Sequence, residues 1–305
     1  MSTEYIHFTT EQREFARQTD LVALLQSQGE HLKRSGKEYV WRDGSEKVTV
    51  RGNLWFHQYE RIGGDAVDFV RRFYDMDFPQ AVNFLLGNNG GTIQRAEPVK
   101  QEPKKPFELP PQNDNMRRVY AYLLNRRGID REVLSAFVHK GMIYESADYH
   151  NAVFVGYDEH GIARHAHKRG TGSESTYKGN AESCDPRYSF HWTGTDNALY
   201  LFEAPIDMLS FISLHKEDWR SHSYAAACCV GDQVLCQMLK ANPNIDTVHL
   251  CMDNDAAGQA ANKRISDKLF IQGIKHEILV PSLKDWNEDL LYDEQEETEC
   301  QTLQL

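Results

Sequence analysis

The sequence lacks several features that would assign it to a common class of protein. No stretch approaches the roughly 18 consecutive apolar residues of a membrane-spanning helix. The first residues, 1–5, hold neither a basic head nor an apolar run, so we expect no signal peptide, a cytoplasmic location and no membrane partner. The six cysteines form no Cys-x-x-Cys pair, which argues against a disulfide framework or a zinc site of that kind.

Positive charge is scarce in the last third of the chain. Residues 196–305 carry 8 Lys and Arg against 19 Asp and Glu, a net of −11 that equals the formal charge of the whole chain. Residues 1–195 are therefore neutral overall. Because an acidic segment that loads divalent cations can lie beside a neutral one that contacts phosphate, the total charge does not exclude a nucleic-acid ligand.

Acidic residues follow two short apolar runs in this last third. Residues 199–202 lead into Glu203, and residues 248–252 lead into Asp253 and Asp255. Short apolar runs bounded by turn residues predict buried strands, and a helical pattern follows each of them. In open α/β sheets the carboxyl ends of the strands are where ligands bind, so we expect these carboxylates to converge.

Converging carboxylates predict a metal site. They would repel one another unless a cation neutralised them, and all-oxygen ligands suit Mg²⁺ or Mn²⁺. We therefore expect Glu203, Asp253 and Asp255 to hold one or two such ions. The alternative is that Asp253 and Asp255 only cap the helix that follows, which is the commoner role of an isolated Asp-x-Asp.

The surrounding pattern predicts an α/β fold. Strands are expected at 199–203, 223–229, 246–252 and 275–280, and helices at 205–215, 232–241 and 256–272. Alternation of this kind is typical of a parallel sheet that helices cover on both faces.

Glu203 and the stretch Asp253-Asn254-Asp255-Ala256-Ala257-Gly258 resemble the Toprim domain. That domain is shared by bacterial primases, type IA and II topoisomerases, small nucleases and recombination proteins. The family's Glu is usually followed by Gly, whereas Ala204 stands here. The resemblance implies that Glu203, Asp253 and Asp255 are catalytic residues that bind metal.

A Lys-Asp pair follows the last predicted strand, at a place where primases have such a motif. The resemblance implies a phosphate contact for Lys284 and a metal contact for Asp285. The alternative is a polar loop that caps the helix beginning near Asp289.

The first 90 residues predict a small sheet between helices. Thr9 and Gln12 fit a capping box for a helix that runs to Leu25, with Gly29 as its stop. Strand-like pieces follow at 39–41, 48–50 and 54–56, and helices are expected from Gly63 to Val70 and over 78–86. This order resembles the zinc-ribbon domain at the start of bacterial primases, whose Gly-Gly-Asp-Ala-Ile-x-Phe motif is matched by Gly63 to Phe69.

The zinc ligands of that family are missing. Residues 1–110 contain no cysteine, and His57 and Glu60 stand where a Cys-x-x-Cys is expected. These two residues alone cannot complete a tetrahedral site, so we expect no zinc. Structural zinc often supplies the folding energy of such small domains. Here the packing of four aromatic side chains is expected to replace it: Trp41, Trp55, Phe56 and Tyr59.

The middle of the chain predicts a helix that Gly128 ends, then a strand pair around the turn at Asp158 to Gly161. Arg127-Gly128, Arg169 and Tyr177-Lys178-Gly179-Asn180 resemble the core of primases. In that family the basic residues here line the groove for template and nucleotide, which implies that role for Arg164, Lys168, Arg169 and Lys178.

Strand alternation divides the basic run. It places Arg164 and Lys168 on one face and His165, His167 and Arg169 on the other, so only part of the run can face one groove. The alternative is a solvated strand face without a ligand.

Together these patterns predict five segments. They are a zinc-ribbon-like domain without zinc ligands (1–90), a Pro/Lys-rich linker (91–115), an α+β primase-core-like domain (116–195), a Toprim domain (196–292) and an acidic tail (293–305). The order also resembles that of uncharacterised proteins of plasmids, phages and integrative elements.

The resemblance implies a function in the DNA metabolism of a mobile element. We expect primase-like, metal-dependent nucleotidyl transfer on single-stranded DNA during its replication or transfer. Nucleotides and single-stranded DNA would be the ligands, and a replicative helicase or relaxase the protein partner. Two alternatives stay open: a Toprim nuclease that cuts phosphodiester bonds, and a non-catalytic DNA-binding or assembly factor.

Overall fold

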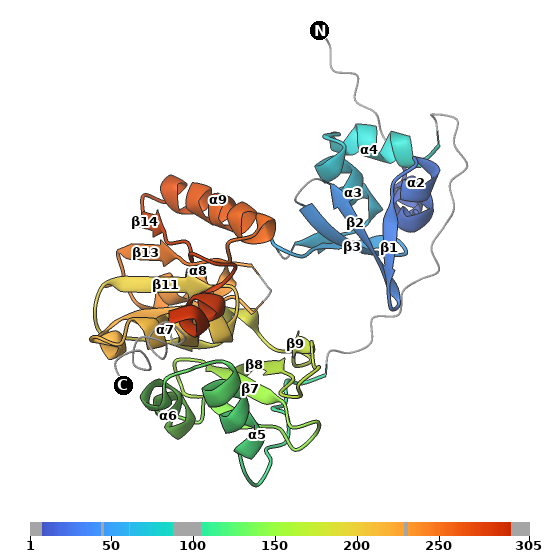
Figure 1. Ribbon diagram of the computed structural model, residues 1–305. Helices are drawn as coiled ribbons and strands as arrows, with labels where there is room; N and C mark the ends of the chain where they lie inside the picture. Colours follow the sequence, from blue (N-terminus) through green and yellow to red (C-terminus); the bar gives the residue numbers. More distant parts are fainter. Residues whose placement is uncertain (1–7, 44–45, 61, 88–104, 229–230, 294–305) are drawn as a thin grey trace, which may run out of the picture. The chain divides into compact units, whose positions relative to one another are not determined.

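The computed structural model describes residues 8–43, 46–60, 62–87, 105–228 and 231–293 (Figure 1). Contacts divide the chain into two compact units, Met1–Pro103 and Lys104–Leu305. The predicted acidic tail lies almost wholly outside the described residues, as does most of the predicted linker. No helix in the described ranges combines the length and the apolar character needed to span a membrane.

The first unit contains a five-stranded antiparallel sheet with strand order β1-β2-β3-β4-β5. The strands are β1 (Leu32–Ser35), β2 (Glu38–Asp43), β3 (Glu46–Arg51), β4 (Leu54–His57) and β5 (Gly63–Gly64). Its helices are α1 (Thr10–Arg17), α2 (Leu21–Ser27), α3 (Ala66–Phe73) and α4 (Phe78–Leu85). The three predicted strands are confirmed, whereas β1 and β5 were not predicted.

Helix caps set the boundaries in this unit. The capping box of Thr9 and Gln12 is confirmed, because each backbone N–H donates to the other's side chain, at 2.9 and 3.2 Å. The expected continuous helix to Leu25 is wrong, because the side chain of Asp20 accepts from the Ala23 N–H and begins a second helix. Local capping by Asp20 therefore outweighs the helical spacing of the apolar residues.

Aromatic side chains fill the core of the first unit. Trp41 and Trp55 are buried as expected, and Phe69 lies between them, with its ring centroid 5.3 Å from Trp41 and 6.1 Å from Trp55. Phe56 and Tyr59 are only half-buried and lie outside this core, which corrects their predicted role. Phe56 neighbours the buried Trp55 on β4, and successive side chains of a strand point to opposite faces.

The second unit contains two sheets. The antiparallel one has the order β6-β7-β8-β9, and the other has the order β10-β12-β11-β13-β14. In the latter, β11, β12, β13 and β14 are parallel and only the edge strand β10 is antiparallel. The strands are β6 (Ile143–Glu145), β7 (Ala152–Tyr157), β8 (Ala163–Arg169), β9 (Lys178–Asn180), β10 (His191–Trp192), β11 (Ala198–Phe202), β12 (Ser223–Ala226), β13 (Thr247–Leu250) and β14 (Lys275–Ile278).

Helices cover both faces of the parallel sheet (Figure 1). Helices α8 (Gln233–Ala241) and α9 (Ala256–Ile271) pack with Leu201 and Leu250 in one cluster. Helix α7 (Pro205–Leu214) packs on the other face with Phe202 and Tyr224. The predicted α/β fold class with a helix-covered parallel sheet is therefore confirmed.

The cluster under α7 also joins the two sheets of this unit. It includes Phe154 from β7 and Phe137 from α6 (Arg131–His139) beside the residues of α7. The predicted helix before Gly128 begins as α5 (Arg117–Tyr120) and continues as a π-helix (Ala121–Arg126). Because the sheets share one core, side chains from both are held rigidly relative to each other.

Candidate functional site

One cavity lies where the antiparallel and parallel sheets of the second unit meet. It opens at the carboxyl ends of β11 and β13, which are neighbours in the parallel sheet, with Leu201 paired to Leu250. Acidic and basic side chains share its lining: Arg127, His167, Arg169, Lys178, Glu203, Asp207, Asp253, Lys284 and Asp285. Two predicted carboxylates, Glu203 and Asp253, are thus brought together with three predicted basic residues and Asp285.

The carboxylates of the cavity crowd one another. Burial, reinforced by the charges of Glu203, Asp285 and Asp255, raises the pKa of Asp253 to about 7. Burial also raises the pKa of Glu203, although Lys178 opposes this shift. The pKa of Asp207 lies well above its usual range, chiefly because the side chain is buried and then because Asp253 is near. The site therefore concentrates negative charge that its own residues do not fully neutralise.

The donor chemistry of this cluster fits a hard divalent cation. The Oδ1 atom of Asp253 is buried and has no hydrogen-bond partner among the described residues. Buried acceptors are normally paired, so such an atom points to a missing partner. Glu203 and Asp253, with Asp207 or Asp285, are the residues that would hold the ion. Within the described ranges, however, no three His, Cys, Asp or Glu side chains are arranged so that they could hold a metal ion, so these residues would have to draw closer around one.

Asp255 differs from Asp253. Its Oδ1 accepts hydrogen bonds from the N–H groups of Ala257 and Gly258, at 2.9 and 2.8 Å, and so caps α9. The capping alternative thus describes Asp255, which is absent from the cavity lining, while Asp253 faces the cavity.

Gly258 lets the backbone of Asp253 lie against the first turn of α9. A Cβ atom at this position would lie 2.0 Å from the carbonyl oxygen of Asp253, which no side chain tolerates. The final Gly of the Asp-x-Asp-x-x-Gly stretch is therefore a steric requirement for placing Asp253.

The basic wall of the cavity is organised by Tyr122. Its hydroxyl accepts hydrogen bonds from Nε of Arg127 at 3.0 Å and from Nε of Arg169 at 3.4 Å. The π-helix makes the first contact possible, because the Arg127 N–H bonds the carbonyl of Tyr122, five residues earlier, at 3.1 Å. This wider turn places the Arg127 guanidinium 5.2 Å from the centre of the Tyr122 ring.

Asn287 links Arg127 to α7, the helix that carries Asp207. Its side chain donates to the Arg127 carbonyl at 2.7 Å and to Ser210 Oγ on α7 at 2.9 Å. Its Oδ1 accepts from Arg127 Nη1 at 2.9 Å. Asn287 is 2% exposed, so these bonds are shielded from water. They link the π-helix to the helix that carries Asp207.

Sequence reasoning missed several of these residues. Asp207 lies in the first turn of α7, four residues after Glu203, and a second carboxylate so soon after Glu203 was a usable signal. Arg127 belongs to the Arg-Gly pair that carried the resemblance to primases. Strand alternation had already placed His167 on the face of Arg169. No pattern in the sequence marked Asn287, which lines the cavity, or Tyr122, which contacts two of its arginines.

Two predicted nucleotide-binding residues lie away from the cavity. The guanidinium of Arg164 donates from Nε to Asp158 Oδ2 at 2.7 Å, at the turn between β7 and β8. The ammonium of Lys168 lies 5.8 Å from the centre of the Tyr177 ring. Neither lines the cavity. This agrees with strand alternation, which places Arg164 and Lys168 on one face of β8 and His167 and Arg169 on the other.

Lys178 and Lys284 both line the cavity. Asp285 lines it as well, while its Oδ1 accepts from the Glu288 N–H at 2.8 Å. Asp285 thus has both a capping contact and a place at the cavity, so the expected metal contact and the capping alternative are compatible.

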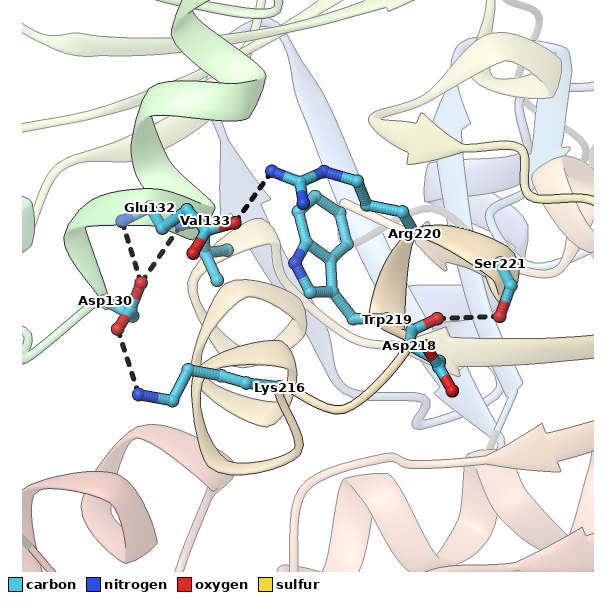
Figure 2. Close-up of a pocket in the computed structure, with 8 residues that line it drawn as sticks. All are labelled: Asp130, Glu132, Val133, Lys216, Asp218, Trp219, Arg220 and Ser221. Atoms are coloured by element: carbon cyan, nitrogen blue, oxygen red, sulfur yellow. Dashed lines mark hydrogen bonds and ion pairs between the residues drawn. The ribbon is translucent and has the colours of Figure 1, made fainter.

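A second cavity lies between the start of α6 and residues 216–221 (Figure 2). Its basic side chains are both paired: Lys216 with Asp130 at 3.1 Å and Arg220 with Glu132 at 2.9 Å. Asp130 also caps α6 through the N–H groups of Glu132 and Val133. Because these contacts neutralise both basic side chains, this cavity offers less to an anionic ligand than the first one.

Two family models match the second unit. Residues 200–290 match the model described as Toprim-like. Residues 121–196 match the model described as a protein of unknown function (DUF3991). The uncharacterized protein pXO2-78 of Bacillus anthracis is 25% identical over 276 residues, which cover 85% of this chain and 79% of that protein.

Solved primase structures are also similar. The zinc binding and RNA polymerase domains of Aquifex aeolicus primase are 16% identical, with a TM-score of 0.39 over 96% of this chain and 84% of that one. The primase fragment of the bacteriophage T7 primase-helicase protein is 19% identical, with a TM-score of 0.43 over 59% and 73% of the two chains. Both TM-scores are too low to carry an argument about activity. By its family-model match and its sheet, the segment from 200 to 290 is a Toprim-like domain, and a DUF3991 domain precedes it.

Proposed function

We propose that this protein is a primase-like Toprim enzyme that transfers nucleotides on single-stranded DNA with the help of a divalent cation. The observation that carries the proposal is the cavity in which Glu203 and Asp253 face Arg127, Arg169 and Lys178. Carboxylates that suit a hard cation, opposite side chains that suit phosphate oxygens, are the two parts that phosphoryl transfer requires.

The acidic residues have a defined task in this proposal. Glu203 and Asp253 would hold Mg²⁺ or Mn²⁺, which supplies neutralisation of the charge that develops on the transferring phosphoryl group. Asp207 and Asp285 border the same cavity and would complete or support the ligand set. Asp255 keeps α9 in register and so positions Asp253 through the chain between them.

The basic residues would bind the phosphates. An arginine guanidinium matches phosphate oxygens with parallel N–H donors. Tyr122 engages Arg127 and Arg169 through Nε. Among the described residues, no hydrogen bond engages the terminal N–H groups of Arg169, so they stay available to a ligand. Lys178 and Lys284 would add point charges, and binding through phosphates makes affinity depend on salt.

The wider context belongs to the same proposal. We place the reaction in the replication or transfer of a mobile element, with a helicase or relaxase as partner. The first unit and the Pro/Lys-rich segment would then be an accessory domain and a spacer, as the predicted division at 90, 115, 195 and 292 implies.

Two observations favour a second candidate, a non-catalytic DNA-binding or assembly factor. Asp255 caps α9, and among the described residues no three His, Cys, Asp or Glu side chains are arranged to hold a metal ion. In this alternative the basic wall binds DNA and the carboxylates carry no chemistry. A nuclease would use the same cavity as a primase, so only its products distinguish it.

The test is incubation of the purified protein with single-stranded DNA, labelled nucleotides and Mg²⁺ or Mn²⁺. The proposal expects labelled oligomers, and their loss in Asp253→Asn but not in Asp267→Asn, an exposed position on α9. Shortened DNA would instead support a nuclease. DNA binding without either product would support the assembly factor. Arg169→Ala is expected to weaken DNA or nucleotide binding and to flatten its salt dependence.

A further inference from the structure

His167 is a buried histidine on the cavity wall to which the proposed chemistry gives no task. It is 3% exposed, yet it lines the cavity together with Arg169 and Lys178. Across the pair of strands β8 and β9, His167 lies opposite Asn180, and Arg169 lies opposite Lys178. The imidazole is therefore the next side chain on the cavity face after the two cations.

The hydrogen bonds of Asn180 determine which ring nitrogen carries the proton. Asn180 Nδ2 donates to the carbonyl of Cys228 at 3.1 Å, and a carbonyl oxygen can only accept. The other end of the amide must then be the oxygen, and it lies 2.7 Å from His167 Nδ1. Because an amide oxygen has no hydrogen to give, Nδ1 must carry the proton and donate it.

The same environment keeps the ring neutral. Burial lowers the pKa of His167 to about 4, and the charges of Lys178 and Arg169 add to the shift, although the bond to Asn180 opposes it. In the neutral ring with a proton on Nδ1, the other nitrogen, Nε2, is a hydrogen-bond acceptor. No hydrogen bond to Nε2 occurs among the described residues, so the acceptor is available to a ligand in the cavity.

The acceptor must meet a part of the ligand that can donate a hydrogen bond. Ionised phosphate oxygens cannot donate, and carboxylates that bind a cation are ionised and can only accept. His167 and Arg169 are two positions apart along the strand, a backbone spacing of about 6.6 Å. That separation is comparable with the distance from the α-phosphate of a nucleotide to its 2′ and 3′ hydroxyl groups.

We propose that Nε2 of His167 accepts a hydrogen bond from a sugar hydroxyl of a nucleotide whose phosphates lie against Arg169 and Lys178. This inference rests on the proposed function and adds a sugar-selecting subsite to it. His167 acts here as an acceptor and not as a general base, because a base needs a pKa near the working pH to hold the proton it takes. Asn180 is a positioning residue that fixes the ring.

The test compares nucleotide binding with Mg²⁺ present but no DNA, by calorimetry. Each of the four ribonucleoside triphosphates is compared with its 2′-deoxy and 3′-deoxy forms, which separates the two hydroxyls. We expect the wild type to bind one deoxy form roughly 3- to 10-fold more weakly, the usual effect of one lost hydrogen bond. His167→Phe should remove this preference, whereas His160→Phe, at an exposed turn position, should retain it.

A second measurement needs no variant and no activity. Nitrogen-15 NMR of the His167 ring should show a proton on Nδ1 and none on Nε2 at pH 7, and Asn180→Leu should disturb this state. A proton on Nε2, or equal affinity of the wild type for all three sugars, would overturn the inference while the proposed function stands. Failure to bind any of the nucleotides would overturn both.

Discussion

The two units differ in whether the polar side chains at the positions that resemble a metal site have partners within the protein. In the first, His57 is buried and its Nδ1 accepts from the Glu60 N–H at 3.0 Å, while Glu60 pairs with Arg72 at 2.8 Å. In the second, Oδ1 of Asp253 is buried without a partner among the described residues, and the pKa of Asp253 is raised to about 7.

The paired side chains of the first unit contribute to the fold. The buried acceptor of the second unit is instead available to a ligand. The positions that resemble a zinc site are satisfied by the protein itself, and aromatic packing stabilises the unit around them. The cavity of the second unit keeps like charges close together, which costs stability unless a ligand binds. Unsatisfied groups of this kind are typical of functional sites.

The largest expected effect removes the aromatic packing of the first unit. Phe69 is fully buried between Trp41 and Trp55, so Phe69→Ala should lower the free energy of unfolding of this unit by about 3–5 kcal/mol. Chemical denaturation measures it. Phe270→Ala is the matched control, since Phe270 is 79% exposed on α9 and should change stability by less than about 0.5 kcal/mol. A small effect of Phe69→Ala would mean that something other than aromatic packing holds this unit together.

The second largest expected effect is a fall in the stability of the second unit at low pH. The pKa of His167 is about 4 in the folded protein against 6.5 when unfolded, so below pH 6.5 the unfolded chain binds a proton that the folded one does not. Stability should therefore fall as the pH drops from 6.5 to 4, by about 3 kcal/mol from this residue. The charges that act on the pKa of the ring are those of Lys178 and Arg169, while Glu203 lines the same cavity.

Denaturation at several pH values checks this in wild type and His167→Phe. The acidic carboxylates titrate in both proteins, so only the difference between the two curves reports on His167. A difference that stays constant between pH 7 and pH 4 would show that His167 does not titrate as the burial of its ring requires.

An intermediate effect tests the link between Gly258 and the acidic site. Gly258→Ala places a Cβ 2.0 Å from the Asp253 carbonyl and should destabilise the second unit by about 1–3 kcal/mol. It should also weaken any stabilisation by Mg²⁺, since Asp253 must move. Gly172→Ala is the control, because its Cβ would meet no atom nearer than 3.7 Å. Thermal melts with and without Mg²⁺ measure both changes, and an unaltered Mg²⁺ response in Gly258→Ala would separate Gly258 from the site.

The smallest effect concerns the paired residues of the first unit. The Glu60–Arg72 pair is partly exposed, so Glu60→Gln should cost less than about 1 kcal/mol. We also expect elemental analysis of the purified protein to find no stoichiometric zinc, because His57 and Glu60 are engaged within the protein. About one zinc per chain, lost in Glu60→Gln, would place these residues in a metal site and erase the contrast between the two units.

The sequence predicted the second unit better than its site. The first residues of the strands and helices from β11 to β14 lie within one residue of the predicted ones, because apolar runs, Pro205 and the cap at Asp255 are local signals. The predicted ends of β12, β13 and β14 are wrong, since these strands stop two or three residues earlier. The basic wall depends instead on a π-helix and on Asn287, which reaches Arg127 from 160 residues away. Such contacts arise only when the two sheets share a core, so no local pattern reveals them.

Thermal melts of wild type and Asp253→Asn at pH 8, with and without millimolar Mg²⁺ or Mn²⁺, test the central claim most directly. Asp253 is ionised at this pH and repelled by Glu203, so Asp253→Asn should keep or raise the melting temperature without metal. The wild type should gain stability from the metal by mass action and the variant should not, while Asp267→Asn should respond like the wild type. A lower melting temperature of Asp253→Asn without metal, together with an unchanged metal response, would contradict the assignment of Asp253 to a cation site.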